Sequence, residues 1–190
     1  MAELKALYEL FILGRLMAQP FHGYLLRRLL SVAIGPARQI SWGVLYPLMR
    51  RLEDDGLIAS VSPGDAPAAE AQEGERQRRV YQITDAGKAR FYELMREPGE
   101  YNVDYADAFS IKLSSFAYIP RAEQLDILRH YRGYVRFVQQ FVLATRQRVA
   151  TLPAIRDFER VHYLRMLDHK LHLLAADLDW VEREIAREDA

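Results

Sequence analysis

The chain has 190 residues, half of them hydrophobic, with 26 basic and 26 acidic side chains and no cysteine. This length supports one large domain or two small ones, and the lack of cysteine excludes disulfides, thiol catalysis and cysteine-based zinc sites. The balanced charge argues against a protein that holds nucleic acid by overall charge alone, so any DNA affinity must come from local patches. No signal peptide or long apolar run is visible, and we expect a cytoplasmic protein with no membrane partner.

The first half of the chain predicts a winged helix-turn-helix. Its expected elements are helices over 4–18, 24–30 and 41–55, strands over 57–62 and 79–83, and a helix from 84 to about 96. Ser41 and Thr84 are expected helix caps, and Gly56 is a helix stop. The segment between the two strands is rich in Pro, Gly, Ala and Glu, which predicts a long, mobile hairpin tip.

The second half predicts a short helix over 104–116 and two long helices separated near Pro153. The last helix has a heptad seam with a second apolar stripe beside it, at Met166, Leu173 and Trp180. Two stripes require two partners, which we interpret as the preceding helix and a second subunit. The expected dimer interface contains Leu164, Leu167, Leu171, Leu174, Leu178, Trp180, Val181 and Ile185.

These elements define a mainly α fold with a small β-wing. We expect a winged helix-turn-helix DNA-binding domain over residues 1–97. Residues 98–190 are expected to form an antiparallel helical domain for dimerisation and effector sensing.

The stretch ISWGVLYPLMRRLEDDGLI places two helix breakers, Gly43 and Pro47, inside an amphipathic helix. Gly43 would let a large surface come close, and would also leave room for a kink at Pro47. Trp42, Tyr46 and Arg50 follow one another at intervals of four residues on one helix face. This favours a helix whose N-terminal end enters a DNA groove. The alternative is that Trp42 and Tyr46 are core residues.

Three segments resemble the PadR family of bacterial transcriptional regulators. The shared motifs, in chain order, are His22-Gly23-Tyr24, Leu45-Tyr46-Pro47, Leu52-Glu53 with Gly56-Leu57-Ile58, and Tyr81 with Thr84 and Gly87. The resemblance covers most of residues 4–95, and the second half is similar to the helical domain of the family's longer branch. It implies a homodimer on a pseudo-palindromic double-stranded DNA operator. Such a protein is usually a repressor, and in one branch a phenolic acid releases it. Trp42 departs from the small residue or proline that the family favours.

The candidate DNA-binding residues come from the second and third helices, the loop before the third, and the wing. They are Gln39, Ser41, Trp42, Gly43, Tyr46, Arg50, His22, Gly23, Tyr24, Arg76, Arg78 and Arg79. Backbone N–H groups at residues 22–24 would bind phosphate; alternatively His22 only caps its helix. The wing arginines either touch the DNA backbone or form a solvated cluster, since acidic residues lie beside them.

An effector site requires rings for an aromatic group and a cation for a carboxylate. The candidates are Tyr101, Tyr105, Phe109, Arg132, Arg136 and His162. The alternative is a set of core aromatics with solvated arginines. No metal site or cofactor is expected, because no carboxylate or cysteine completes the set His162, His169 and His172.

Two other functions remain open at this stage. An activator of the same fold would bind DNA together with a partner protein, and a helical interaction module would have lost DNA binding. An enzyme is not expected, because the chain has no phosphate loop, nucleophile elbow or paired carboxylates in an apolar setting.

Overall fold

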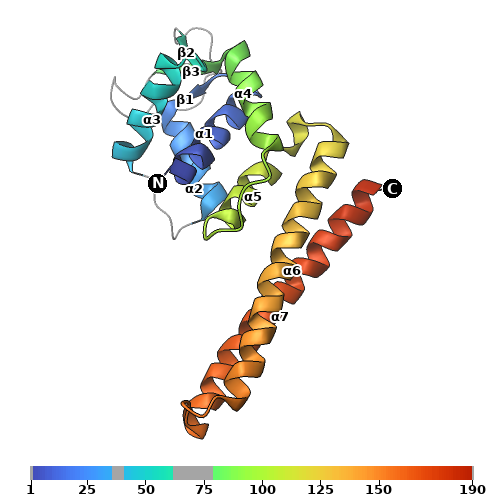
Figure 1. The fold of residues 1–190 in the computed structure, drawn as a ribbon. Coiled ribbons are helices and arrows are strands. Elements are labelled where there is room, and N and C mark those ends of the chain that lie inside the picture. Colours follow the sequence, from blue (N-terminus) through green and yellow to red (C-terminus); the bar gives the residue numbers. More distant parts are fainter. Residues whose placement is uncertain (1, 36–40, 62–78, 190) are drawn as a thin grey trace. The chain divides into compact units, whose positions relative to one another are not determined.

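The computed structural model describes residues 2–35, 41–61 and 79–189 (Figure 1). The expected fold class is confirmed: the chain is mainly helical, with one small antiparallel sheet. The elements in chain order are α1 (Ala2–Leu16), β1 (Phe21–His22), α2 (Gly23–Ile34), α3 (Trp42–Asp54), β2 (Ile58–Val61), β3 (Val80–Ile83), α4 (Asp85–Arg96), α5 (Tyr105–Leu113), the 3-10 helix η3 (Phe116–Tyr118), α6 (Arg121–Thr151) and α7 (Asp157–Asp189).

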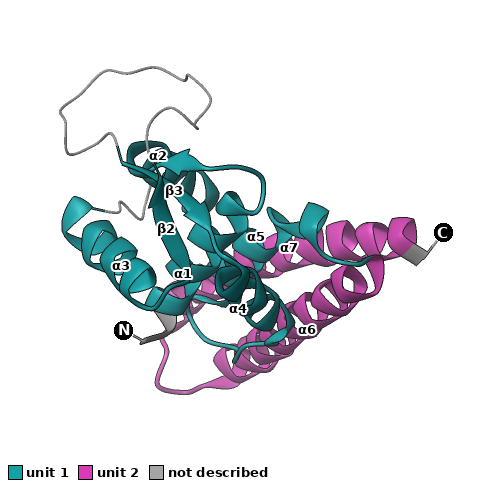
Figure 2. Ribbon diagram, turned by 90° about the horizontal axis from the view of Figure 1, so that it is seen from above, with its two compact units in different colours: residues 1–120 teal, residues 121–190 magenta. Residues whose placement is uncertain are grey.

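The chain forms two compact units, Met1–Pro120 and Arg121–Ala190, which Figure 2 shows in different colours. The division falls after Pro120 and not after residue 97, where the sequence places the domain boundary. The reason is that α5 packs against α1 and α2, so the segment after α4 completes the core of the first unit.

The sheet of the first unit has the strand order β1-β3-β2, and all pairs are antiparallel. The sequence predicts β2 and β3 but no strand between the first two helices, where β1 lies. A strand of two residues is too short to show an alternating pattern, and it exists because Phe21 and His22 pair with Tyr81 and Val80.

Helix α1 forms the centre of the first unit. Phe11, Ile12, Leu13 and Leu16 are each at most 2% exposed, as expected for a helix that is apolar nearly all round. Helices α2, α4 and α5 all pack on it. This core fixes where the surface helix α3 lies.

The start of α4 is locked to the end of the α3–β2 turn. The Thr84 hydroxyl accepts a hydrogen bond from the Gly87 N–H at 3.1 Å, which confirms the expected cap. The same hydroxyl donates to the Gly56 carbonyl at 2.7 Å. Gly87 is packed so closely that a Cβ there would lie 2.0 Å from the Leu57 carbonyl oxygen.

The second unit is an antiparallel hairpin of α6 and α7 (Figure 1). Its register is marked by ion pairs between Arg136 and Glu182 (2.8 Å) and between Arg146 and Asp168 (2.6 Å). The turn is held by Arg160, which donates to the carbonyls of Ala150 (2.7 Å) at the end of α6 and Ile155 (2.6 Å) in the turn.

Part of the expected dimer seam is the core of this hairpin. Leu167, Val181 and Ile185 are buried within a single chain, although the sequence analysis assigned them to a subunit interface. The remaining residues of that set, Leu164, Leu171, Leu174, Leu178 and Trp180, are half-buried. The heptad seam therefore serves the intrachain contact that α7 makes with α6.

None of the helices in the described part of the chain is both long enough and apolar enough to cross a membrane.

Candidate nucleic-acid interface

Helix α3 has a buried face and an outward face. Leu45, Leu48, Met49 and Leu52 are each at most 6% exposed and anchor the helix to the core. At about 100° per residue, the opposite side presents Gly43, Pro47 and Arg50, and all three are exposed. The outward face of the first two turns is therefore low in side-chain bulk.

Nothing in the described part of the chain requires a glycine at position 43. A Cβ at Gly43 would meet only the Ser41 hydroxyl oxygen there, at an ordinary 3.6 Å. The expectation that Gly43 leaves room for a kink at Pro47 concerns the backbone carbonyl of Gly43 and stays a prediction. No neighbour among residues 2–35, 41–61 and 79–189 therefore explains the missing side chain at Gly43.

Trp42 is half-buried and does not stand freely on the outward face. Its ring lies 5.4 Å from the ring of Tyr46, and the Arg27 guanidinium from α2 lies 4.9 Å from its centroid. This cation–π contact ties α2 to the start of α3. The structure thus supports in part the alternative that Trp42 is a packing residue, whereas Tyr46 is 38% exposed.

Several candidates from α2, α3 and the residue just before β3 meet around one shallow pocket. It is lined by Gly23, Tyr24, Trp42, Leu45, Tyr46, Met49, Arg79 and Tyr81. The structure thus brings together residues that are far apart in the sequence, as a shared binding surface requires.

One backbone N–H at the beginning of α2 is already used within the chain. The Gly23 N–H donates to the Arg79 carbonyl at 3.3 Å, so this group is not available to phosphate. His22 occupies the cap position without a side-chain cap bond, and it pairs with Val80 in the sheet. The interpretation of His22 as a capping side chain is therefore wrong.

Arg79 and Tyr81 connect the wing to α3. The Arg79 guanidinium is 65% exposed and lies 3.9 Å from the Glu53 carboxylate of α3. Burial raises the pKa of the Tyr81 phenol, and the nearby Glu53 carboxylate raises it further. Tyr81 is therefore a neutral packing residue under ordinary conditions, and Arg79 is the exposed cation of this edge.

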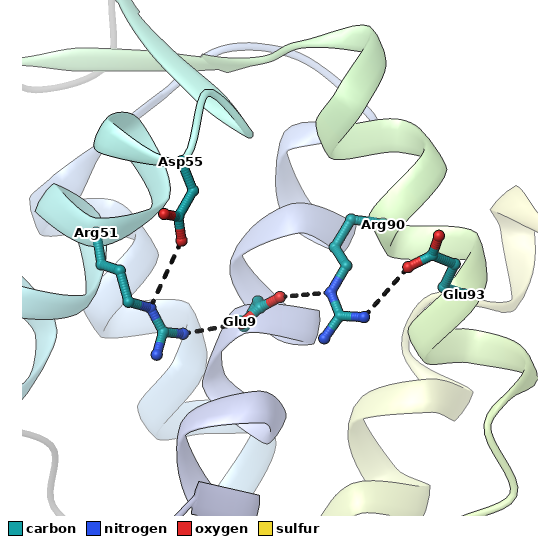
Figure 3. A network of polar contacts seen from close by, with 5 residues as sticks. All are labelled: Glu9, Arg51, Asp55, Arg90 and Glu93. Carbon is teal, nitrogen blue, oxygen red and sulfur yellow. Dashed lines mark hydrogen bonds and ion pairs between the residues drawn. The ribbon is translucent and has the colours of Figure 1, made fainter.

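A buried carboxylate that sequence analysis missed holds α3 in place (Figure 3). The Glu9 side chain of α1 is 8% exposed, and its two oxygens accept from Arg51 Nη2 (2.9 Å) and Arg90 Nε (2.8 Å). Arg51 comes from α3 and Arg90 from α4, so one carboxylate joins three helices. We call Glu9, Arg51 and Arg90 the carboxylate clamp. An acid in the middle of a helix that is apolar nearly all round was the signal for it.

Three candidates, Gln39, Arg76 and Arg78, lie outside the described residues.

The effector candidates are divided between the two units. Tyr105 and Phe109 are 7% and 6% exposed on α5, so they belong to the core of the first unit. The ring of Tyr101 meets that of Tyr105 edge-on, with the centroids 5.2 Å apart. These contacts fit the alternative interpretation of core aromatics.

The cationic candidates lie on the hairpin. Arg136 forms its ion pair with Glu182, and Arg132 is one turn away on α6. His162 precedes Glu182 by 20 residues on α7, a distance of about 30 Å along the axis. The structure does not bring His162 to the two arginines within one chain. In the described part of the chain, no three His, Asp or Glu side chains form a group suited to a metal ion.

Residues 12–93, from within α1 to within α4, match the model of the transcriptional regulator PadR-like family. This part of the chain is a PadR-family domain. That family consists of DNA-binding transcriptional regulators and not of enzymes.

Several solved structures are similar to the chain. Bacillus subtilis PadR in complex with operator DNA is 17% identical, with 94% of this chain and 96% of that chain covered and a TM-score of 0.41. Bacillus subtilis PadR in complex with p-coumaric acid is 19% identical, with 97% and 99% covered and a TM-score of 0.41. The PadR-like regulator BC1756 from Bacillus cereus is 18% identical, with 96% and 98% covered and a TM-score of 0.38. With such low identities and TM-scores, these structures assign no residue roles to this chain. No curated protein matches the chain.

Proposed function

We propose that this PadR-family chain is a homodimeric repressor that inserts the start of α3 into the major groove of a pseudo-palindromic operator. A small aromatic acid would release it from DNA. The observation that carries the DNA-binding part is the outward face of α3, where Gly43 is open to an approaching surface and exposed polar residues stand beside it.

We assign DNA-contacting roles to these residues from the position and the chemical groups of their side chains. Ser41 and Tyr46 offer hydroxyl groups, and Arg50 offers a guanidinium that pairs with guanine or with phosphate. Tyr24 and Arg79 line the pocket beside α3 and are suited to the phosphate walls of the groove.

Dimerisation is proposed through a surface of the hairpin that the intrachain seam leaves exposed. Phe137 and Phe141 of α6 are 56% and 62% exposed, and Met166 and Leu173 of α7 are 47% and 57% exposed. The register of the hairpin places Leu173 at about the level of Phe141. Exposed apolar side chains gathered on a helical hairpin are typical of an interaction surface.

Replacing both Met166 and Leu173 by lysine is expected to convert the dimer into a monomer, because two charges would be buried at the interface. The helical circular dichroism signal should stay unchanged, since both residues lie outside the hairpin core. Light scattering on a sizing column measures the mass.

The matched control is Val161→Lys, which changes another exposed apolar residue of α7, on a different side of the helix. This variant should remain dimeric. A double-lysine variant that still eluted as a dimer would place the interface elsewhere.

The experiment for the whole proposal is a fluorescence-anisotropy titration with labelled DNA from the region upstream of the gene. A scrambled duplex is the control, and two salt concentrations are compared. Tighter binding to the upstream duplex that weakens with salt supports the regulator. Equal weak binding to both duplexes, together with failure of a genome-wide selection for bound fragments, would contradict DNA recognition.

Release by an effector is tested in the same titration, and the sign of regulation is tested with a promoter fusion. Addition of a phenolic acid should lower the affinity for the upstream duplex, and a promoter fusion should be more active when the gene is deleted. An affinity that is unchanged by the phenolic acid would contradict release by this effector. A promoter that is less active after deletion of the gene would show that the protein is an activator.

A further inference from the structure

Val44 follows the helical spacing of the core residues of α3, but the structure places it elsewhere. It is 48% exposed, while its neighbour Leu45 is 1% exposed. A β-branched residue gains nothing from an exposed helical position, because its side chain loses rotamer freedom there. Neither the core nor helix propensity accounts for a valine at this position.

The surroundings of Val44 are apolar as well. Gly43 has no side chain, and the exposed ring of Pro47 lies one turn further along. Arg51, the next long side chain on this side, directs its guanidinium to Glu9 at 2.9 Å. We call Gly43, Val44 and Pro47 the apolar strip. It offers no side-chain hydrogen bond on the outer surface of the first two turns.

The chemistry of the major groove decides what such a strip can contact. Most base edges there carry donors or acceptors, which would lose water against the strip without gaining a hydrogen bond. Thymine is the exception, because its C5-methyl group is apolar. Valine is short, so contact with that methyl requires a close approach of the helix, and Gly43 permits this approach.

We propose that Val44, supported by Pro47, packs on the C5-methyl group of a thymine in each half of the bound DNA. The polar residues Tyr46 and Arg50, on the other side of the strip, then contact neighbouring bases or phosphates. This inference rests on the proposed DNA-binding function and adds a base preference to it.

The test uses the duplex that the wild-type protein binds most tightly in the titration or in the selection. Each thymine is replaced in turn by deoxyuridine, which removes only the methyl group and keeps the base pair. For the wild type, one replacement in each half-site should weaken binding about three- to tenfold, the value of one lost methyl contact. The Val44→Ala variant should bind the thymine duplex more weakly by a similar factor, and should then be indifferent to the same replacement.

The matched control is Val161→Ala, a valine of similar exposure on α7. It should keep the wild-type affinity and the wild-type cost of deoxyuridine. Two outcomes would overturn the inference while leaving DNA recognition intact. One is that no deoxyuridine position weakens specific binding by the wild type. The other is that such a position exists, but its cost is the same in Val44→Ala. If the wild type bound no duplex specifically, the proposed function and this inference would both fall.

Discussion

Gly87→Ala is expected to lower the free energy of unfolding of the winged-helix unit by about 3 kcal/mol, the upper end of overpacking costs. The added Cβ would lie 2.0 Å from the Leu57 carbonyl oxygen and 2.8 Å from Ile83 Cγ1. The carbonyl is a backbone atom and cannot rotate away, and it also accepts the Thr84 N–H at 3.1 Å. Relief of the clash therefore requires α4 to move away from Leu57, in the turn between α3 and β2.

Urea unfolding followed by circular dichroism measures this loss. The matched control is Gly43→Ala, another glycine near the start of a helix, where the added Cβ meets only an ordinary contact at 3.6 Å among the described residues. Its stability should be unchanged or raised by up to about 1 kcal/mol. Equal unfolding midpoints for both variants would mean that α4 does not pack on Leu57 as described.

Glu9→Ala is expected to lower the free energy of unfolding by about 2 kcal/mol and to weaken DNA binding. Removing one partner of a buried ion pair costs roughly 3–5 kcal/mol when the other charge stays buried without a partner. The cost is smaller here because Arg51 and Arg90 are 44% and 38% exposed and stay hydrated. Loss of the carboxylate clamp frees the last turns of α3 from α1 and α4. Binding to DNA must then also order this helix, which lowers the affinity.

The control is Glu93→Ala, which removes an exposed carboxylate 3.2 Å from the same Arg90. An exposed pair is worth about 0.2–1 kcal/mol, so this variant should keep nearly all stability and DNA affinity. The clamp would have no special role if both variants lost the same amount in urea unfolding and in anisotropy.

The elements with strong local signals could be predicted from the sequence. The Thr84 cap, the apolar helix α1 and the two long helices have periodicity or capping chemistry within a few residues. Strand β1 could not be predicted, because only its pairing with β3 makes it a strand. The division after Pro120 depends on α5 packing against α1 and α2, which no local pattern encodes.

The candidate site, too, could be predicted only where a local sequence pattern encodes it. Exposure of Tyr46 and Arg50 follows from the helical period, but the period does not show that Trp42 is half-buried against Arg27 of α2. The carboxylate clamp joins residues of three helices that are distant in sequence, so only the fold reveals it. The heptad seam identified the right residues of α7 but could not say whether Leu167 and Val181 face their own chain or another.

The central claim is that DNA comes close to the start of α3, and Gly43→Ala tests it most directly. The variant adds one methyl group that the free protein accommodates, at an ordinary 3.6 Å from its nearest described neighbour. Anisotropy titrations of wild type and variant against the tightest-binding duplex should show an affinity lower by about tenfold or more, the cost of overpacking a close interface. The unfolding midpoint should be no lower than in the wild type, and the dimer mass should be unchanged. Equal affinity of the two proteins for that duplex would contradict the account, because DNA would then not approach the outward face of α3.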